Sequence, residues 1–376
     1  TKIYDATTTA TLDPSNYQIS GFVAGQSATV NQPSSVGYVA ATAGPETLNA
    51  TLSTTNFVAG SGTKLSNYTL PTTATGTGLV LQAPLILTGV LATNKVYDAG
   101  FGDVLDTAHA GIYGLIGGDA VTLSSVGATG TFASRDAGSN LAVGASGFTL
   151  GGAQQGNYQL VLPQGLTANI TPAPLTITGV SVANKVYDGT TTAALNSGSA
   201  ALSGILGADG ATVLLSSSGA LGAFASKNVG AGLAVTSSGF SISGINSADY
   251  VLAQVTGLSA AITPAPLSVT LIGNPTKSYN GTTTAALSSS NLSVTGFVAG
   301  EGATVPQAAL SEYNSANASV QTITVTLTTP DFAVSGGALL SNYTLPTTVT
   351  GVGTITPAPL AGMIAGNPTK VYDGAT

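Results

Sequence analysis

Apolar and small polar residues alternate along most of the chain with a period of two. In residues 175–182, for example, Leu175 and Ile177 alternate with threonines. Such alternation is typical of half-buried β-strands. Clusters of Gly, Asn, Asp and Pro separate the runs and predict turns. The pattern favours helix only at Ser247–Asp249, where one helical turn is expected. The alternation therefore predicts an all-β protein.

A motif of the form Lys-x-Tyr-Asp-Gly-Thr-Thr-Thr recurs with a period of about 92 residues. Its Asp-Gly pair predicts a tight turn, since Gly accepts positive φ and Asp caps the turn. Where Ala6 and Ala99 replace the Gly, the turn either avoids positive φ or is slightly strained. The motif residues in the five copies are Lys2, Tyr4, Asp5, Lys95, Tyr97, Asp98, Lys185, Tyr187, Asp188, Gly189, Lys277, Tyr279, Asn280, Gly281, Lys370, Tyr372, Asp373 and Gly374.

A period of this length predicts small domains in series. Four repeats are expected, at 1–84, 85–174, 175–266 and 267–359. Residues 360–376 form the first strand and motif of a following repeat, whereas repeat 1 lacks its first strand. Repeats 1 and 4 resemble each other (type A), as do repeats 2 and 3 (type B), whose segments 117–123 and 208–214 align directly. Each repeat has a tyrosine before its last strands, preceded by Asn or Asp: Tyr68, Tyr158, Tyr250 and Tyr343.

A proline-containing segment marks each repeat boundary. Proline fixes φ and disfavours helix at the residue before it, so Pro-Ala-Pro predicts a short, stiff, extended connector. The alternative is a proline pair at a strand edge within one domain. These inter-domain junction residues are Pro84, Pro172, Pro174, Pro264, Pro266, Pro357 and Pro359. The resulting fold is expected to be four small β-sandwich (Ig-like) or β-grasp-like domains, arranged end to end as an elongated rod.

Composition narrows the function. Charged residues make up 6% of the chain, and the net charge is −7. Nucleic-acid binding is not expected, because five of the eight basic residues are the motif lysines, about one per repeat, and such spacing forms no basic patch. No apolar run is long enough for membrane insertion. The absence of Cys fits either a cytosolic protein or export in an unfolded state.

The sequence offers no catalytic or metal site, so we expect no enzyme and no cofactor. The single histidine, His109, is expected on a surface loop, and zinc would need several Cys or His ligands. Asp103, Asp106 and Asp119 lack known calcium-loop spacings, although calcium between loops stays open. The motif tyrosines are expected in the core or in the seam between repeats, with the lysine stems along that seam. The alternative, a Lys–Asp or Lys–Asn isopeptide bond, needs a buried acidic neighbour that does not recur.

These motifs, together with Asn-Tyr-x-Leu and Ile-Thr-Pro-Ala-Pro-Leu, resemble the YDG-type repeats of filamentous-haemagglutinin-like bacterial surface exoproteins. The resemblance covers essentially the whole chain; it departs at Asn280, Ala6 and Ala99 and at the junction 82–84. It implies a repetitive region of an adhesin exported by two-partner secretion, at the cell surface or released from it. Unfolded export through a pore would account for the missing Cys.

The expected function is a structural repeat region of a secreted adhesin or extracellular filament, acting as stalk, spacer or fibre-building unit. The alternative is a module that binds a glycan or matrix protein in adhesion or biofilm matrix; the host or matrix ligand is unknown. Expected partners are neighbouring repeats and, by self-association, other copies. The chain is either a window on a longer array, or residues 360–372 complete repeat 1 of another molecule by strand addition.

Overall fold

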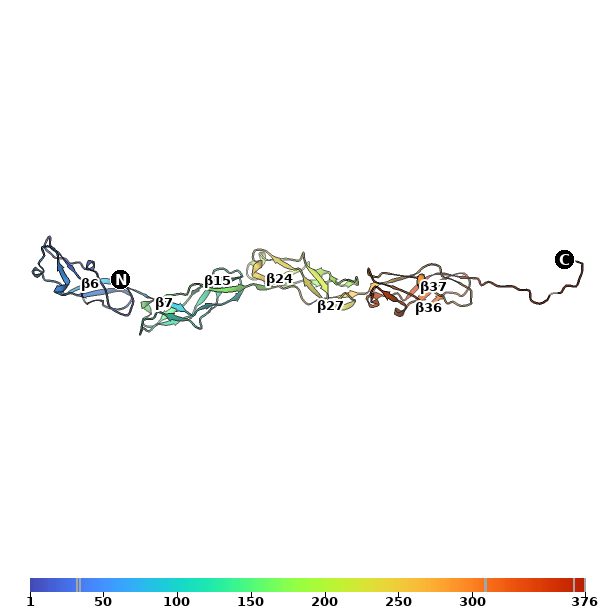
Figure 1. Cartoon of the computed structure of the whole chain (residues 1–376), viewed down its shortest axis with the longest axis horizontal. Coiled ribbons are helices and arrows are strands. Elements are labelled where there is room, and N and C mark those ends of the chain that lie inside the picture. The colour runs from blue at the N-terminus through green and yellow to red at the C-terminus, as the bar shows by residue number, and fades with distance from the viewer. Residues whose placement is uncertain (32, 34, 308–309, 368, 375–376) are drawn as a thin grey trace. The chain divides into compact units, whose positions relative to one another are not determined.

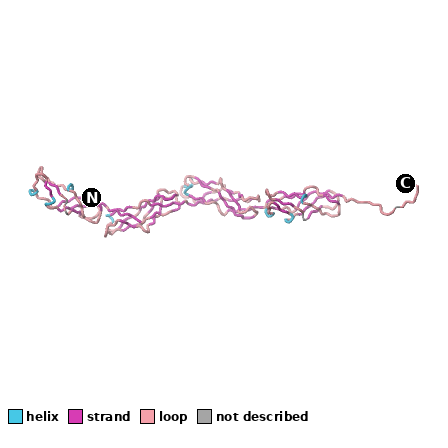
Figure 2. The backbone as a smooth tube through the Cα atoms, viewed as in Figure 1, coloured by secondary structure: helices cyan, strands magenta, loops and turns pink. Residues whose placement is uncertain are grey.

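The computed structural model describes residues 1–31, 33, 35–307, 310–367 and 369–374, and within these ranges the protein is all-β. The sheets are strongly curled half-barrels. Strands alternate with loops, and the described helical segments are single 3-10 turns (Figure 2). The all-β prediction is confirmed, as is the helical turn at Ser247–Asp249. Within the same ranges, no helix has the length and apolarity needed to span a membrane.

The chain divides into two compact units, which we describe separately. Unit 1 comprises residues 1–174, 205–213 and 244–251. Its strands are β1 (Lys2–Ile3), β2 (Ala28–Val30), β3 (Val36–Tyr38), β4 (Gly44–Thr51), β5 (Phe57–Ala59), β6 (Thr73–Leu81), β7 (Ala83–Thr88), β8 (Leu91–Ala92), β9 (Lys95–Val96), β10 (Gly102–Asp103), β11 (Leu105–Asp106), β12 (Gly111–Tyr113), β13 (Thr122–Ser124), β14 (Thr129–Phe132), β15 (Gly138–Ser146), β16 (Thr149–Gly151), β17 (Tyr158–Val161) and β18 (Leu166–Thr171). Its 3-10 turns are η1 (Pro14–Asn16), η2 (Thr54–Asn56), η3 (Leu65–Asn67), η4 (Gln155–Asn157), η5 (Asp209–Ala211) and η6 (Ser247–Asp249).

Two larger sheets organise unit 1. Their strand orders are β1-β6-β4-β3 and β10-β14-β15-β18-β9. In each, the short motif strand lies at the edge and pairs in parallel with the last strand of its own repeat, as Lys95 does with Ile170. A smaller sheet, β12-β7-β17, places the first strand of repeat 2 between two partners. Its strand β7 (labelled in Figure 1) alternates buried and exposed residues along its whole length.

Unit 2 comprises residues 175–204, 214–243 and 252–376, and two strands, β19 (Ala173–Thr178) and β29 (Tyr250–Leu252), contain residues of both units. The other strands of unit 2 are β20 (Ser181–Val182), β21 (Lys185–Val186), β22 (Thr192–Ala193), β23 (Leu195–Asn196), β24 (Ala201–Ser203), β25 (Leu214–Ser216), β26 (Leu221–Phe224), β27 (Gly230–Ser238), β28 (Ser241–Ser243), β30 (Leu258–Thr263), β31 (Ala265–Pro266), β32 (Ser268–Leu271), β33 (Thr276–Ser278), β34 (Leu292–Thr295), β35 (Gly302–Thr304), β36 (Leu310–Tyr313), β37 (Val320–Thr326), β38 (Ala333–Ser335), β39 (Tyr343–Thr344) and β40 (Thr348–Thr356). Its 3-10 turns are η7 (Ser289–Asn291), η8 (Thr329–Asp331) and η9 (Leu340–Asn342).

Unit 2 repeats the arrangement of unit 1. Its larger sheets have the orders β21-β30-β27-β26-β22 and β33-β40-β37-β36, again with a motif strand at the edge, paired in parallel with the last strand of its repeat. The core of repeat 4 gathers around Val305, Ile323 and Val325, which are fully buried. Each repeat therefore closes when its motif strand meets its final strand, far along the sequence.

The boundary prolines belong to strands more than to a separate connector. Pro172 is the single residue between β18 and β19, and Pro264 separates β30 from β31 in the same way. Pro84, Pro174 and Pro266 are each the second residue of a strand. The prolines that were expected to form a separate connector therefore stand at the start of strands. There the extended φ of proline fits and its missing N–H is tolerated. Pro357 and Pro359 follow β40 and lie in no strand.

The predicted first strand of a following repeat does not form a strand. Residues 360–367 and 369–374 have no strand assignment, and Leu360 and Ile364 are 96% and 88% exposed. An isolated strand has no partner for its backbone N–H and C=O groups, which accounts for the difference from the sequence-based expectation. Residues 368, 375 and 376 of this segment lie outside the described ranges.

Candidate functional site

Each motif lysine is held within its own repeat. Lys185 Nζ lies 2.7 Å from Asp188 Oδ1 and donates a 2.8 Å hydrogen bond to the Thr190 carbonyl. It also lies 5.6 Å from the centroid of the Phe224 ring. The equivalent Lys–Asp pairs at Lys2, Lys95 and Lys370 span 2.6, 2.7 and 3.1 Å. The lysine charge therefore closes the local turn, and the expectation that its stem follows the seam stays a prediction.

The motif Asp caps that turn. Asp188 Oδ1 accepts a hydrogen bond from the Thr190 backbone N–H at 2.9 Å. In repeat 1, hydrogen bonds from Lys2 and Thr7 lower the pKa of the Asp5 carboxyl to about 2. The Asp side chains are more than half exposed, so each pair contributes little alone. Such exposure also differs from the buried setting that an isopeptide bond would need.

In repeat 4, Asn280 replaces the motif aspartate and keeps the turn. Its Oδ1 accepts hydrogen bonds from Lys277 Nζ at 3.1 Å and from the Thr282 backbone N–H at 3.1 Å. An amide oxygen thus reproduces the acceptor geometry without the charge.

Ala6 and Ala99 adopt the conformation that Gly189 and Gly281 have in the other copies. Their φ is +62°, against +76° and +73° at the two glycines. A Cβ is disfavoured in this left-handed region. Of the two alternatives that the sequence left open, the strained turn is the one observed.

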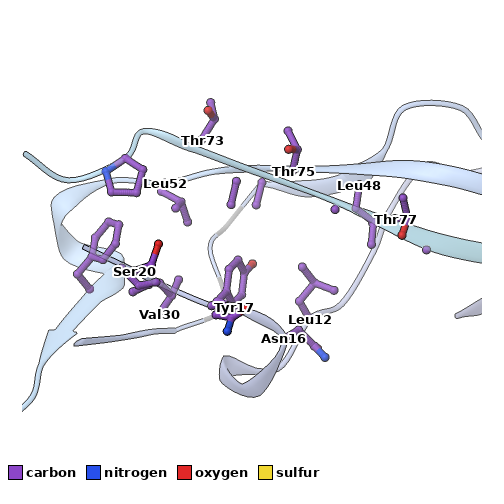
Figure 3. A pocket seen from close by; sticks show the side chains of 18 of the residues that line it. Leu12, Asn16, Tyr17, Ser20, Val30, Leu48, Leu52, Thr73, Thr75 and Thr77 are labelled. Carbon is purple, nitrogen blue, oxygen red and sulfur yellow. The ribbon is translucent and has the colours of Figure 1, made fainter. Parts of the chain in front are cut away.

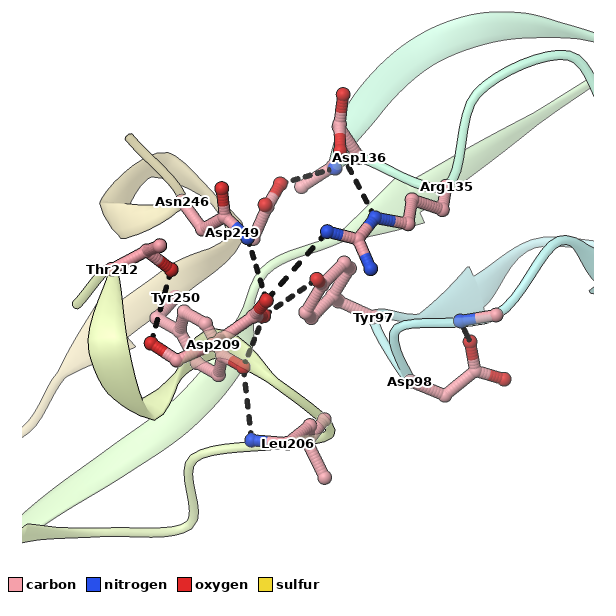
Figure 4. Close-up of polar contacts among 12 residues, drawn as sticks. Tyr97, Asp98, Arg135, Asp136, Leu206, Asp209, Thr212, Asn246, Asp249 and Tyr250 are labelled. Carbon is pink, nitrogen blue, oxygen red and sulfur yellow. Dashed lines mark hydrogen bonds and ion pairs between the residues drawn. The ribbon is translucent and has the colours of Figure 1, made fainter. Parts of the chain in front are cut away.

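A shared carboxylate connects consecutive repeats (Figure 4). Tyr97 of repeat 2 and Tyr250 of repeat 3 both donate hydrogen bonds to Asp209 Oδ2, at 2.7 and 2.9 Å. Their rings meet edge to face with centroids 5.3 Å apart. Tyr97 and Asp209 are 2% and 1% exposed. We call such a set a junction triad: the motif tyrosine, the carboxylate of the next repeat and that repeat's late tyrosine.

The same triad occurs at the other two junctions. Tyr4 and Tyr158 donate to Asp119 Oδ2 at 2.8 and 2.6 Å. Tyr187 and Tyr343 donate to the two carboxylate oxygens of Glu301 at 2.7 and 2.6 Å, and the ring pairs are 5.5 and 5.4 Å apart. A recurrent triad with two different carboxylic acids indicates that the charge and its position matter more than the side-chain length.

Local structure positions each member of the triad. The Tyr97 backbone N–H donates to Thr171 beside the parallel pair β9–β18. Asp209 starts η5, and Tyr250 starts β29 directly after η6. The Tyr250 hydroxyl also accepts the Leu206 N–H at 3.0 Å, so it is satisfied as both donor and acceptor. Strand ends and 3-10 turns thus bring the three groups together.

The buried carboxylate is compensated from both repeats. Asp209 Oδ1 accepts from Asn246 at 2.6 Å and lies 3.7 Å from Arg135 Nη2 of repeat 2. Burial alone would raise the pKa of Asp209, but hydrogen bonds from Tyr97, Tyr250 and Asn246 and the Arg135 charge outweigh it, and the pKa is lowered. Burial, together with the hydrogen bond to the carboxylate, raises the pKa of Tyr158 and Tyr343 to about 12. Burial likewise raises the pKa of Tyr97 and Tyr250, so the Asp209 triad holds one charged acceptor and two protonated donors at neutral pH.

A backbone hydrogen bond reinforces every junction. Its acceptor is the Asn or Asp that precedes the late tyrosine, and its donor is a backbone N–H of the preceding repeat. Asp249 Oδ1 accepts from Ala137 N–H at 2.7 Å, and Asn342 Oδ1 accepts from Val229 N–H at 2.9 Å. Asn157 accepts in the same way from Ala43 N–H at 2.9 Å. The Asn/Asp-Tyr pairs thus have a role that the sequence did not suggest.

The structure brings together only part of the predicted motif. Tyr4, Tyr97 and Tyr187 lie at junctions, whereas Tyr279 is 46% exposed and Tyr372 is 93% exposed. Sequence reasoning missed Asp119, Asp209 and Glu301 as partners. Aligning 117–123 with 208–214 placed Asp119 beside Gly210, one position from its structural counterpart Asp209. The recurring motif tyrosine, followed in the next repeat by a recurring acidic residue, was the signal that could have indicated these partners.

Other candidate residues do not form a site. His109 lies exposed in a loop, and Asp103 accepts hydrogen bonds from Thr93 at 3.1 and 3.3 Å. Within the described ranges, no group of three or more His, Cys, Asp or Glu side chains is placed to hold a metal ion. The junction triads, whose hydroxyls stay protonated at neutral pH, are suited to joining repeats and not to proton transfer.

A family model described as the YDG domain matches three successive stretches of the chain, residues 82–167, 171–257 and 263–351. Together they span more than half of the chain, and each contains a motif tyrosine, a junction carboxylate and a late tyrosine. The resemblance to YDG-type repeats is confirmed for these stretches. No curated protein matches the chain significantly.

Proposed function

The chain belongs to the YDG domain family, and from that premise we propose that it is a structural repeat region of a secreted bacterial surface adhesin or extracellular filament. Its repeats act as a stalk, spacer or fibre-building unit. We further propose four domains arranged end to end, of which the matched stretches cover three. The chain that carries them belongs, in this proposal, to a filamentous-haemagglutinin-like exoprotein of the two-partner secretion type.

The junction triad is the observation that carries this proposal. An aspartate that is 1% exposed is expensive to bury unless it is charge-paired and hydrogen-bonded. At three successive junctions both tyrosines donate to one carboxylate, which is buried at Asp209 and half-buried at Asp119 and Glu301. A chain whose repeats only needed to be tethered would have no use for a carboxylate shared between them at each of these junctions. The triads favour a role in which neighbouring repeats stay docked.

Composition supports an extracellular location. The chain has no Cys, so nothing in it would lock a fold before passage through a pore. Only 6% of its residues are charged, and its seven Asn-x-Ser/Thr sequences (x other than Pro) offer places for sugar to keep the surface soluble. Both properties fit a protein exported unfolded that folds outside the cell.

Single-molecule force spectroscopy on residues 1–376 tests the proposal. A mechanical spacer gives successive unfolding events with a constant contour-length gain of about 30 nm, from roughly 90 residues at 3.3–3.6 Å each. Replacing Asp209 by Ala is expected to lower the force of the events assigned to repeats 2 and 3 and to leave the others unchanged. A chain that extends without discrete events would overturn the mechanical role.

A further inference from the structure

The motif turn of repeat 4 contains the single Asn-Gly pair of the chain, Asn280-Gly281. Both residues are exposed, and φ of Gly281 is +73°. Because glycine has no Cβ, its backbone nitrogen can approach the preceding side-chain amide without steric hindrance. That approach is the first step by which an asparagine loses ammonia and becomes aspartate. Among the asparagines of the chain, Asn280 therefore has the least hindered following residue.

Three hydrogen-bond donors converge on the side-chain oxygen of Asn280. Its Oδ1 accepts from Lys277 Nζ at 3.1 Å, from the Thr282 backbone N–H at 3.1 Å and from the Thr282 hydroxyl at 2.9 Å. Attack on Cγ moves negative charge onto this oxygen, and donors that are already in place stabilise such charge. The cationic Lys277 gives the strongest of these hydrogen bonds once the charge has developed. The turn therefore has the arrangement of an oxyanion hole around the Asn280 amide.

The Lys277 ammonium is held in place independently of Asn280. It donates to the Thr282 carbonyl at 2.7 Å and to the Thr284 carbonyl at 3.0 Å. It also lies 5.4 Å from the centroid of the Tyr313 ring. The ammonium therefore stays beside Oδ1 whether the side chain at this position is an amide or a carboxylate.

The motif copies of repeats 1–3 lack the amide, the glycine or both. Asp5 and Asp98 are followed by alanine, and Asp188 is a carboxylate followed by Gly189. Burial would raise the pKa of Asp188, but hydrogen bonds from its own turn outweigh burial and lower the pKa, so the side chain is ionised at neutral pH. An ionised carboxylate repels a nucleophile. Only the turn of repeat 4 combines the reactive amide with the unhindered nitrogen.

Repeat 3 shows that the turn accommodates an aspartate with the same donors. Asp188 Oδ1 accepts from Lys185 Nζ at 2.7 Å and from the backbone N–H and hydroxyl of Thr190 at 2.9 Å. The motif Asp side chains of repeats 1–3 are between 51% and 59% exposed although a further repeat follows each of them. Access of water is therefore a property of the turn itself.

We propose that the motif turn of repeat 4 is a self-modification site, at which Asn280 is converted to aspartate without an enzyme. The Gly281 nitrogen loses its proton to water and bonds to Asn280 Cγ, and the Cγ–Nδ2 bond breaks as Nδ2 leaves as ammonia. Water then adds to Cγ of the resulting succinimide ring, the bond from Cγ to the Gly281 nitrogen breaks, and that nitrogen regains a proton. The net change is the gain of one water and the loss of one ammonia.

Conversion completes the motif in repeat 4. The added negative charge lies beside Lys277, as in the Lys185–Asp188 pair of repeat 3. The donors on Oδ1 also favour attack of water at Cγ over attack at the backbone carbonyl carbon of the ring, so the folded chain should yield aspartate in preference to isoaspartate. This inference goes beyond the proposed function and does not depend on it, since a chain that resists conversion would keep its spacer role.

Peptide mass spectrometry on residues 1–376, kept folded at neutral pH and sampled over time, tests the proposal. The peptide that contains Asn280 is expected to gain the mass difference between an amide and an acid. Asn16, beside Tyr17 in repeat 1, is an internal reference (Figure 3). It is exposed and its Oδ1 accepts the Asp13 N–H at 2.8 Å, but a bulky residue follows it. Asn280 should convert at least tenfold faster than Asn16.

Two variants separate the roles of the glycine and the lysine. Gly281→Ala hinders ring closure and should slow conversion at least tenfold, and the turn tolerates it because Ala6 and Ala99 occupy the same position at φ +62°. Lys277→Met removes one donor from Oδ1 and should slow conversion about tenfold or more. Circular dichroism verifies that both variants fold.

A pair of variants in the other repeats transfers the reaction. Asp188→Asn creates an Asn-Gly pair with the same donors in repeat 3, and it should convert as Asn280 does. Asp98→Asn is the matched control, because Ala99 follows it, and it should convert at least tenfold more slowly. Equal rates for these two variants, conversion of Asn280 no faster than that of Asn16, or no effect of Lys277→Met would refute the self-modification site.

Discussion

Tyr97→Phe isolates the contribution of one junction hydroxyl. The substitution removes the 2.7 Å hydrogen bond to Asp209 and keeps the ring that meets Tyr250 edge to face. No cavity larger than one oxygen atom is created. Asp209 keeps its hydrogen bonds from Tyr250 and Asn246, so the carboxylate stays partly compensated.

The expected loss follows from the charge of the acceptor. A hydrogen bond to a charged group contributes about 1.5–3 kcal/mol. Because every 1.4 kcal/mol is a factor of ten, the junction between repeats 2 and 3 should open about 10- to 150-fold more often. The free energy of unfolding of each separate repeat should change little.

Native-state hydrogen exchange followed by NMR measures this opening directly. The Ala137 N–H donates across this junction to Asp249, so its exchange reports the opening. The Val229 N–H donates across the next junction to Asn342 and serves as a reference in the same molecule. Tyr97→Phe should accelerate Ala137 alone, and Tyr187→Phe should accelerate Val229 alone.

Tyr279→Phe is the matched control, since it changes the same motif position where the side chain is 46% exposed. At concentrations where the chain is monomeric, it should alter neither amide. Unchanged exchange at Ala137 in Tyr97→Phe, or equal acceleration by Tyr279→Phe, would refute the reasoning that the triads hold the repeats together.

Three further predictions concern the motif turns, the protonation of the late tyrosines and the motif lysines. Ala99→Gly should stabilise repeat 2 by about 0.5–1 kcal/mol, because φ is +62° at this position and glycine tolerates it. Gly189→Ala should destabilise repeat 3, because φ is also positive there and the added Cβ would lie 2.8 Å from the Val298 side chain. Urea denaturation measures both free energies of unfolding, and effects of the same sign would contradict the argument. Tyr158 and Tyr343 have folded-state pKa values near 12 against about 10 when unfolded, so their contribution is complete below pH 10 and is lost as pH rises towards 12; a urea midpoint that stays constant between pH 9.5 and 11.5 would exclude it. Lys185→Met should cost roughly 0.5–1.5 kcal/mol, because it removes the Asp188 pair and the Thr190 hydrogen bond, and Lys370→Met, on an exposed segment, should cost nothing measurable by thermal denaturation.

The alternation of apolar residues and the 92-residue period were sufficient to predict strands, motif turns and repeats. Strand patterning depends on neighbouring residues only, as at Leu175 and Ile177, both buried on one face of β19. Turn chemistry is equally local: Asp188 caps through an atom two residues away. Such features can be read from a single sequence.

The junction partners could not be predicted because they join distant residues. Tyr97 and Asp209 are 112 residues apart, so no local pattern joins them, and the recurrence of an acidic residue in the following repeat indicates a partner but not its pairing. The C-terminal segment shows the converse: residues 360–364 have a strand-like pattern, yet they form no strand without a partner. The local pattern therefore shows that a segment can form a strand, whereas the strand with which it pairs depends on the rest of the molecule.

The parallel pairing of each motif strand with the last strand of its repeat has a consequence for biogenesis. Thr171 bonds to the Lys95 carbonyl 76 residues earlier, so repeat 2 cannot close until nearly all of it is available. Contacts of such high order make folding slow. When the chain emerges from one end, as in synthesis or translocation, it should therefore fold one whole repeat at a time. The Tyr97 triad is completed only when the next repeat has folded, so each newly folded repeat would stabilise the repeat before it.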